Sequence, residues 1–572
     1  MRYRFKPMLA IGSALLLLLG ACSNDDQPAA PTGGADLIVV NADAYTSNPD
    51  APRTQAFAVK DGRFIAVGST DEIASMAGPS TEVIDAAGRT VTPGFIDGHI
   101  HLVLGLRLLT GVDLSYIPEK SKWLEIIAQK DKELPEGQWI IGGNWDYTLG
   151  EGKLPSKEDL DAVVPNRPVL LEDIDGHSAW ANSKAIQLAG ITANSPVPVG
   201  GQILIDPATG EPTGIFLEQA IVLFDDLPGQ IPTADQTRSA LVQAIKNANS
   251  YGITSVHEIA TLDAAGLYQD LQENQELTLR TWFGTVGLNE GAEALVAARN
   301  DMNLRAKSME LDTLGPLFEY GFIKFYMDGV LSTHTAVLKE PYADRPDVNG
   351  VPFMSLSEMK TSIKTANDNG FSVAVHAIGD GAVSMVLDAY ADVGNAPAGR
   401  PNRIEHIEVT TPDDVQRFSE LGVAPVMQPN HATGTIGKYI NQRLGDEREN
   451  NAYVWQSMLE ADANLILSSD WPTSPLDPLA HFSDAIFRES PFGLGDGTWH
   501  PEQAVSFEQT LTAYTQSAAN LTPWRDQIGS ITVGKWADFV VLDGKLPEPM
   551  DKSFRERSVK STYLAGKLVY SN

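Results

Sequence analysis

Two histidines, His99 and His101, stand one residue apart in the stretch VTPGFIDGHIHL at residues 91–102. Side chains alternate along a β-strand, so residues two apart lie about 7 Å from one another on the same face. Such a pair can hold a metal ion, but His-x-His pairs also occur by chance on solvated strands. Other residues of the chain must therefore decide between these two interpretations.

Four further candidates each lie at or near the end of a later apolar strand: Lys324 in GFIKFYMDG, His376 in VAVHAIGD, His406 in RIEHIE and Asp470 in ILSSDWP. Neutral imidazoles and carboxylates are ligands for zinc and related divalent metals. Cys22 is the single cysteine of the chain, which excludes a zinc site built from several thiolates. The candidate site is therefore one of nitrogen and oxygen ligands.

The elements that must position these residues alternate between strand and helix from about residue 93 to 520. Short apolar strands are followed by helical segments such as SLSEMKTSIKTANDNG and TPDDVQRFSELG. This alternation predicts an α/β protein with a (β/α)8 TIM barrel, which gathers the C-terminal ends of its strands at one mouth. An insertion at about 106–230, with its own α/β pattern, follows the first barrel strand.

Short alternating strands broken by turns occur at both ends of the chain. They appear in ADLIVVNADAYT and STEVIDAAGRTVTPG near the beginning, and again in GSITVGKWADFVVLDG and SVKSTYLAGKLVYS near the end. We therefore expect a small β-sandwich domain formed from residues 36–92 together with 521–572.

Residues 1–21 have the pattern of a secretory signal: basic residues, an apolar run, and small residues before Cys22. The sequence LGAC resembles the bacterial lipoprotein box. The resemblance implies cleavage before Cys22, lipid on its thiol, a tether at residues 22–35, export across the inner membrane and a membrane anchor at the periplasmic face of the cell envelope. In the alternative interpretation, an ordinary signal is cleaved near Ala21 and Cys22 has no role.

The formal net charge of −32 and a pI near 4.6 argue against nucleic acid as a partner, because binding to phosphates needs a basic face. A small-molecule substrate is the expected partner. Edge strands of the terminal β domain can pair between two copies, so a homodimer remains open.

The sequence resembles the amidohydrolase superfamily, and within it amidohydrolase family 3, the YtcJ-like branch. The motifs that carry the resemblance are PGFIDGHIHL, GNWD, DGHSAWANSKA, GITSVHE, KFYMDG, VHAIGDGA, RIEHIE and SSDWP. It implies one or two divalent metal ions, zinc first among them. His99, His101 and Asp470 would hold one ion and His376 and His406 the other, with Lys324 bridging both as a carboxylated lysine.

The chemistry of lysine is consistent with that bridging role. A lysine made neutral by burial can take up carbon dioxide and become a carbamate, which is an anionic oxygen ligand. In the alternative, Lys324 is an ammonium paired with Asp328 or Glu405. If Lys324 is not carboxylated, a single-metal site is favoured.

The resulting hypothesis is a metal-dependent hydrolase for carbon–nitrogen bonds other than peptide bonds. An amide would be hydrolysed by a metal-bound hydroxide, with Asp470 as the general base that passes the proton to the leaving nitrogen. Asp470 can also cap a helix, and the two roles are compatible. Three alternatives remain: an esterase or lactonase with the same site, an isomerase, and a binding lipoprotein without catalysis.

Further residues match family positions near the substrate. His177 in DGHSAW is expected to donate a hydrogen bond to the substrate carbonyl or oxyanion, although it can equally be a histidine at a helix start. Trp145 is expected at the pocket wall and His257 at the barrel mouth, with core packing as the alternative for both. His431 follows a strand and is expected to face the substrate. Two carboxylates are expected to orient the metal ligands: Asp328 and Asp380.

Overall fold

The computed structural model describes residues 34–115, 117–146, 154–174, 176–198, 200–225, 227–229, 233–394, 396–397, 400–434, 440–489 and 498–572. The expected signal, Cys22 and nearly all of the expected tether lie outside these ranges. Within the described ranges, the structure has no helix with the length and apolarity that a membrane span requires.

Eight parallel strands form the central barrel and confirm the predicted TIM-barrel class. The backbone N–H of Asp470, which follows the last strand, donates to the carbonyl of His99 in the first strand at 2.9 Å, so the ring is nearly closed. In order around the barrel the strands are β8 (Phe95–Ile100), β15 (Ile253–Ala260), β16 (Arg280–Val286), β17 (Phe318–Tyr326), β18 (Ser372–Ala377), β19 (Arg403–His406), β20 (Ala424–Met427) and β21 (Ile466–Leu467).

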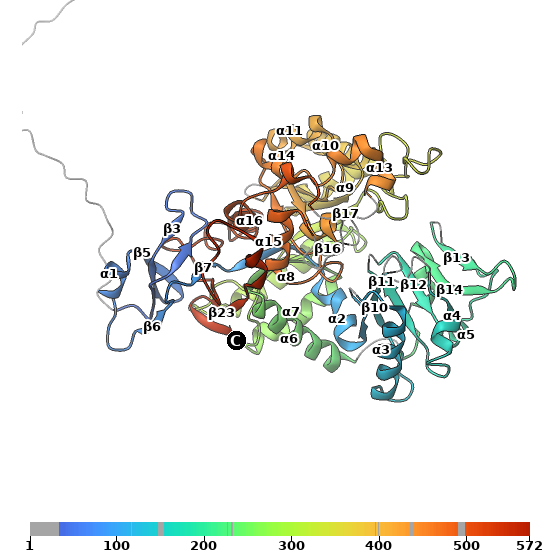
Figure 1. Ribbon diagram of the computed structural model, residues 1–572, viewed down its shortest axis with the longest axis horizontal. Helices are drawn as coiled ribbons and strands as arrows, with labels where there is room; N and C mark the ends of the chain where they lie inside the picture. The colour runs from blue at the N-terminus through green and yellow to red at the C-terminus, as the bar shows by residue number, and fades with distance from the viewer. Residues whose placement is uncertain are drawn as a thin grey trace, which may run out of the picture.

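Helices between the strands surround the barrel (Figure 1). Local sequence sets their ends: Ser355 and Glu358 form a capping box at the start of α9, and Gly422 ends α11 in a left-handed conformation. The main helices are α2 (Leu102–Thr110), α6 (Ala234–Ser250), α7 (Ala265–Glu273), α8 (Ala292–Ser308), α9 (Leu356–Asp368), α10 (Asp380–Val393), α11 (Pro412–Leu421), α12 (Pro429–Thr433), α13 (Ile440–Arg448), α14 (Trp455–Glu460), α15 (Pro478–Phe487), α16 (Phe507–Ala513) and α17 (Gln516–Ala519).

Strands from the two ends of the chain lie together at one side of the barrel (Figure 1). One sheet has the order β24 (Lys567–Ser571), β23 (Val559–Leu564), β22 (Phe539–Leu542), β7 (Thr90–Pro93), β2 (Asp43–Tyr45) and β3 (Arg53–Thr54). The other has the order β5 (Arg63–Gly68), β4 (Ala56–Lys60), β1 (Leu37–Val40) and β6 (Glu82–Asp85), with the short helix α1 (Thr70–Ala74) beside it. The two sheets share a buried apolar core in which the rings of Phe57 and Phe539 lie 5.0 Å apart.

The insertion forms a separate six-stranded sheet on the opposite side of the barrel from the terminal sheets (Figure 1). Its own apolar clusters, which include Trp145 and Trp180, hold it together. Its strands, in sheet order, are β13 (Gln202–Ile205), β14 (Pro212–Leu217), β12 (Ser178–Ala181), β11 (Leu170–Asp173), β10 (Gly142–Trp145) and β9 (Val112–Asp113). Its helices are α3 (Lys120–Glu133), α4 (Lys157–Asp161), α5 (Ser183–Leu188) and the 3-10 helix η1 (Glu218–Phe224).

Candidate metal centre and catalytic cavity

Three predicted ligands meet at the C-terminal end of the barrel. Nε2 of His99 lies 3.2 Å from Nε2 of His101, and Oδ1 of Asp470 lies 3.2 and 3.4 Å from these two nitrogens. All the ligand atoms of this group are within 4.8 Å of one another. Two imidazole nitrogens and one carboxylate oxygen converging in this way form a donor set that suits a divalent metal ion.

The backbone is left-handed at two of the predicted ligands, with φ of 76° at His406 and 58° at Asp470. Residues other than glycine rarely adopt this conformation, and those that do are concentrated at functional sites. At His406 it interrupts the alternation of β19, so two neighbouring residues both serve the centre. Glu405 reaches His99, whereas Nδ1 of His406 lies 3.8 Å from Oδ2 of Asp470.

The histidine rings are oriented by hydrogen bonds from one ring nitrogen each. Nδ1 is bonded in three of them: from His99 to Oε2 of Glu405 at 2.6 Å, from His101 to the Ile259 carbonyl at 3.0 Å, and from His406 to Oε1 of Gln428 at 2.9 Å. Nε2 of His376 instead donates to the Gly329 carbonyl at 3.0 Å. A neutral ring that donates one N–H keeps its other nitrogen as a ligand, so these contacts prepare the rings for a metal.

His431 joins a second group of possible ligands with His406 and Asp470. Its ring is stacked on that of His406, and its Nε2 lies 3.7 Å from Oδ2 of Asp470. Although His431 is only 3% exposed, neither of its ring nitrogens has a hydrogen-bond partner among the described residues. We expected His431 to face the substrate, and the structure also places it within reach of a metal.

Lys324 reaches the same region from β17 and is almost fully buried. Burial lowers the pKa of its ammonium to about 8, although Glu405 and Asp470 act in the opposite direction. In the described part of the chain, Lys324 makes no ion pair with Asp328 or Glu405. Asp328 instead accepts backbone N–H groups from three residues: Val337, Ile378 and Gly379.

A buried charge pair, Arg403 and Glu405, packs behind the candidate metal ligands. Nε of Arg403 lies 2.7 Å from Oε1 of Glu405. Burial by itself would raise the pKa of Glu405, but Arg403 and His99 outweigh it and lower that pKa to about 2. Arg403 also donates to Nδ1 of His257 at 2.8 Å, and the His257 ring packs against Trp282. His257 is fully buried there and, unlike our expectation, does not line the barrel mouth.

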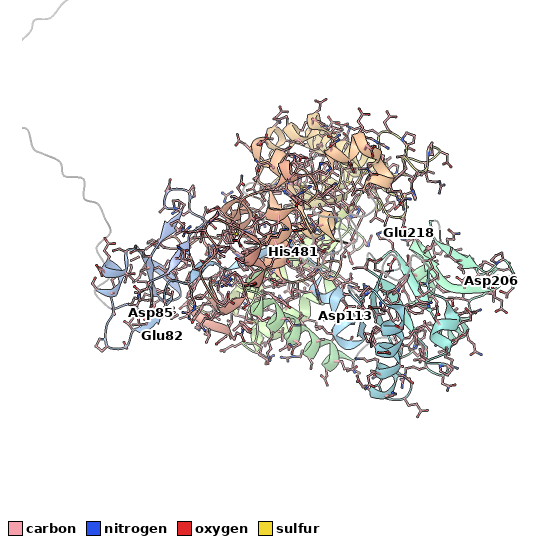
Figure 2. All side chains as sticks on the ribbon, in the orientation of Figure 1. Glu82, Asp85, Asp113, Asp206, Glu218 and His481 are labelled. Atoms are coloured by element: carbon pink, nitrogen blue, oxygen red, sulfur yellow. The ribbon has the colours of Figure 1, made fainter. Side chains whose placement is uncertain are left out.

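A cavity of about 370 Å3, which we call the catalytic cavity, opens over the centre. Six of the predicted site residues line it on the barrel side: His101, Lys324, His376, His406, His431 and Asp470. His177 lines it from the insertion, where its Nδ1 is bonded to Oε2 of Glu218 at 2.8 Å. Glu218 stands on the edge of the insertion that faces the barrel, far from Asp206 at the outer tip (Figure 2).

The predicted pocket wall at Trp145 differs from the structure. Its indole is fully buried in the core of the insertion, packs against Trp180, and donates to the Leu171 carbonyl at 2.9 Å. The expected orienting residue Asp380 accepts the backbone N–H of Lys339 at 2.9 Å rather than a ligand histidine. Residue type alone does not distinguish a buried tryptophan from one that faces a ligand.

Sequence reasoning missed several supporting residues. Glu405 entered it only as a partner for Lys324, although its place beside His406 in RIEHIE was a usable signal. Asp97 lies two residues before His99 on β8, and its Oδ1 accepts the backbone N–H groups of His99 and Ser469 at 3.3 and 3.1 Å. Gln428, which orients His406, had no recognisable motif.

Comparison with known proteins gives a consistent result. The model of the amidohydrolase family matches residues 82–570. The putative amidohydrolase YtcJ of Bacillus subtilis is 31% identical over 542 residues, which cover 92% of this chain and 98% of that protein. An N-substituted formamide deformylase of Arthrobacter pascens is 31% identical over 546 residues, 94% of this chain and 98% of that protein.

A similar crystal structure is that of an uncharacterized metal-dependent hydrolase from Pyrococcus furiosus. It has a TM-score of 0.68 and 26% sequence identity, and the match covers 88% of this chain and 98% of the other. Similarity in fold and in sequence thus extends over most of the molecule.

Proposed function

This chain belongs to the amidohydrolase family, and from that membership we propose that it hydrolyses an amide bond other than a peptide bond. The observation that carries the proposal is the convergence of His99, His101 and Asp470 at the floor of a cavity of small-molecule size. The printed activity of the Arthrobacter pascens relative makes N-substituted formamides the first substrates to test.

The donor set fits a divalent metal ion, with zinc as the first choice. His99, His101 and Asp470 would hold one ion, and His376 and His406 a second, with His431 in reach of it. When bound, such an ion supplies Lewis-acid chemistry: it lowers the pKa of water and polarises a carbonyl group. The ring contacts described above support this assignment, because each uses one ring nitrogen of a ligand histidine and leaves the other to bind a metal ion.

Asp470 is proposed to accept a proton from the attacking water and to deliver it to the leaving nitrogen. Burial alone would raise the pKa of this carboxyl group, but the neighbouring His99 and His101 outweigh that effect and hold it well below its usual range. Asp470 is therefore ionised at neutral pH and lines the catalytic cavity, as a general base must.

Lys324 is proposed to carry a carbamate. The buried ammonium of Lys324 would first lose one proton. The neutral Nζ would then form a bond to the carbon of carbon dioxide and release a second proton, which leaves an anionic oxygen ligand in place of a buried cation. The pKa of about 8 supports this step, because it keeps a part of the lysine neutral near physiological pH. The absence of an ion pair with Asp328 or Glu405 supports it as well.

His177 is proposed to bind the substrate carbonyl oxygen. The contact between its Nδ1 and Oε2 of Glu218 orients the ring at the wall of the catalytic cavity, where an N–H of the ring would donate to the substrate oxygen. A preoriented donor of this kind stabilises the negative charge that develops on the carbonyl oxygen during attack.

The test is product detection by mass spectrometry. Protein lacking residues 1–35, loaded with zinc or manganese and with bicarbonate present, is given N-substituted formamides, N-acyl amino acids, aryl amides, aryl esters and lactones. We expect amide cleavage that is lost in Lys324→Ala. Cleavage of esters alone would replace the amide assignment by an esterase, and no turnover of any substrate by the metal-loaded protein would contradict it.

We also propose that lipid on Cys22 anchors the protein to the cell envelope, on the strength of the LGAC sequence. Cys22→Ser is expected to move the protein from the membrane fraction to the soluble fraction. Unchanged membrane association of this variant would contradict the proposal.

A further inference from the structure

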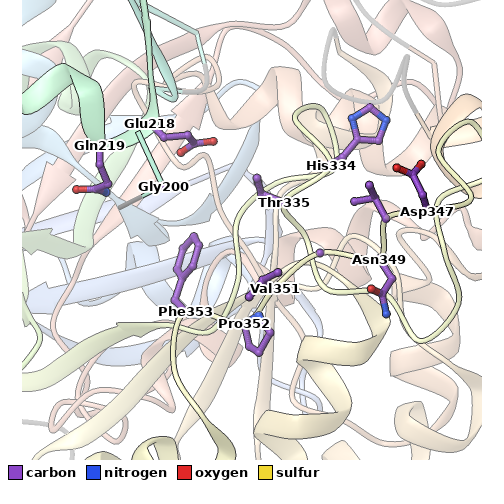
Figure 3. A pocket seen from close by; sticks show the side chains of 12 residues that line it. Gly200, Glu218, Gln219, His334, Thr335, Asp347, Asn349, Val351, Pro352 and Phe353 are labelled. Atoms are coloured by element: carbon purple, nitrogen blue, oxygen red, sulfur yellow. The ribbon is translucent and has the colours of Figure 1, made fainter. Parts of the chain in front are cut away.

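A larger cavity of about 700 Å3, which we call the outer cavity, has the lining that Figure 3 shows, and the contacts given below place it beside the catalytic cavity. One wall is formed by Gly200, Glu218 and Gln219 of the insertion, and the other by residues 334–335 and 347–353 of the segment that follows β17. Small-molecule sites in proteins usually measure about 300–1,000 Å3, so each cavity has room for a part of one ligand.

The two cavities share a boundary on both sides. On the insertion side, His177 lines the catalytic cavity, and its partner Glu218 lines the outer cavity. On the barrel side, residues 330–332 line the catalytic cavity and residues 334–335 line the outer cavity. A molecule bound over the metal ligands and extending past the His177–Glu218 contact would therefore enter the outer cavity.

The barrel-side wall is held in place by backbone contacts. The backbone N–H of Phe353 donates to the Met327 carbonyl at 2.8 Å, which fixes the end of the segment directly after β17. Gly350 has a φ of +77°, and a Cβ atom there would come within 2.1 Å of the Ala336 carbonyl oxygen. Only glycine permits this close approach, so the segment is folded tightly against itself by contacts within the chain.

The same wall exposes large apolar side chains. Val351 is 75% exposed and Phe353 is 57% exposed, and Figure 3 draws both near Pro352 in this wall. Among the described residues, two carboxylates line the outer cavity, Glu218 and Asp347, and the ring of His334, which also lines it, is paired with Asp344. An apolar surface beside carboxylates favours an uncharged apolar group and disfavours an anionic one.

We propose that the outer cavity binds an uncharged apolar arm of the amide substrate, aryl or long alkyl, while the amide group lies in the catalytic cavity. The inference rests on the proposed amide hydrolysis and names its substrate class: amides with one bulky apolar substituent. Val351 and Phe353 are the specificity-determining residues, because they contribute exposed apolar surface to the site without touching the metal ligands.

Binding without turnover provides the first test. Methanesulfonamides resist hydrolysis, so isothermal titration of the metal-loaded protein with N-(1-naphthylmethyl)methanesulfonamide measures affinity alone. The N-methyl analogue lacks the arm, and the N-(2-carboxyethyl) analogue carries an anionic one. We expect the naphthyl compound to bind at least about tenfold more tightly than either analogue.

Matched variants locate the effect. Phe353→Asp and, separately, Val351→Asp should weaken binding of the naphthyl compound about tenfold and leave the N-methyl analogue unchanged. Leu304→Asp is the control, because Leu304 is 71% exposed on α8 and lines neither cavity. Equal affinities for armed and armless compounds, or equal losses in the control, would overturn the proposal.

Kinetics separate this inference from the proposed function. With N-(1-naphthylmethyl)formamide, the two cavity variants should raise KM about tenfold, whereas N-methylformamide should be cleaved as in the wild type. Failure to cleave either formamide counts against amide hydrolysis and leaves the titration as the test of the cavity. Cleavage of both with equal kcat/KM counts against the outer cavity and supports the amide chemistry.

Discussion

The catalytic cavity and the outer cavity share a boundary, but they are built from different kinds of residue. Around the catalytic cavity the predicted metal ligands come from the ends of barrel strands or directly follow them, are largely buried, and most are hydrogen-bonded in one orientation. Around the outer cavity the side chains come from a connecting segment and from the edge of the insertion, and the apolar ones are largely exposed.

This difference separates two requirements of an enzyme. Groups that hold a metal or move a proton must be fixed within fractions of an ångström, which a closed sheet provides. Groups that select a substrate substituent need only offer a complementary surface, which a segment outside the sheet can supply and vary. Substitutions in the two cavities should therefore differ sharply in their effects.

The strongest contrast is expected at Asp470. Asp470→Asn keeps the size of the side chain but removes both the proton acceptor and an anionic ligand, so kcat for a cleaved amide should fall by about 10³-fold or more. The measurement is the rate of amine release from metal-loaded protein, with circular dichroism as the control for folding. A fall of less than tenfold would exclude Asp470 as the general base.

The free energy of unfolding should depend on the buried pair of Arg403 and Glu405. Glu405→Gln leaves Arg403 without its anionic partner, and breaking a buried pair in this way typically costs about 3–5 kcal/mol. The measurement is the free energy of unfolding in urea. Glu82→Gln, at an exposed position on β6, is the matched control and should change this free energy by less than about 0.5 kcal/mol. Equal effects of both changes would contradict the structural role of the pair.

Metal content tests whether His431 belongs to the centre. If it is a ligand, His431→Ala should weaken retention of zinc about tenfold in competition with a chelator, as measured by elemental analysis of the protein after dialysis. His481→Gln provides the comparison, because His481 is a buried histidine of α15 whose Nε2 donates to the Pro475 carbonyl, and it belongs to neither group of possible metal ligands among the described residues. If both variants retain the same amount of zinc, His431 is not a metal ligand, and contact with the substrate is its remaining role.

The smallest effect is expected in the outer cavity. Because Val351 is three-quarters exposed, Val351→Ser should change the free energy of unfolding by less than about 0.5 kcal/mol. Thermal unfolding followed by circular dichroism measures this change. A loss of more than 2 kcal/mol would indicate that the segment stabilises the fold, and the contrast between the two cavities would then disappear.

The sequence was informative where the periodicity of a strand determines the direction in which its side chains point. Alternation of strands and helices predicted the barrel, and the strand-end positions of His99, His101 and Asp470 placed them at one mouth, where the structure brings them together. Packing between elements distant in sequence was harder to predict. The burial of Trp145 depends on the insertion's own core, and the position of His431 depends on the short helix α12 after β20.

The terminal sheet has a consequence for the order of folding. Strand β7 pairs with β2 and also with β22, which lies more than four hundred residues further along the chain. Such a pairing has a high contact order, and it cannot form before residues 539–542 have been synthesised. Until then the apolar face of β7 lacks its neighbour. During synthesis, which starts at the N-terminus, this strand therefore stays partly uncovered until the last strands of the chain have been made.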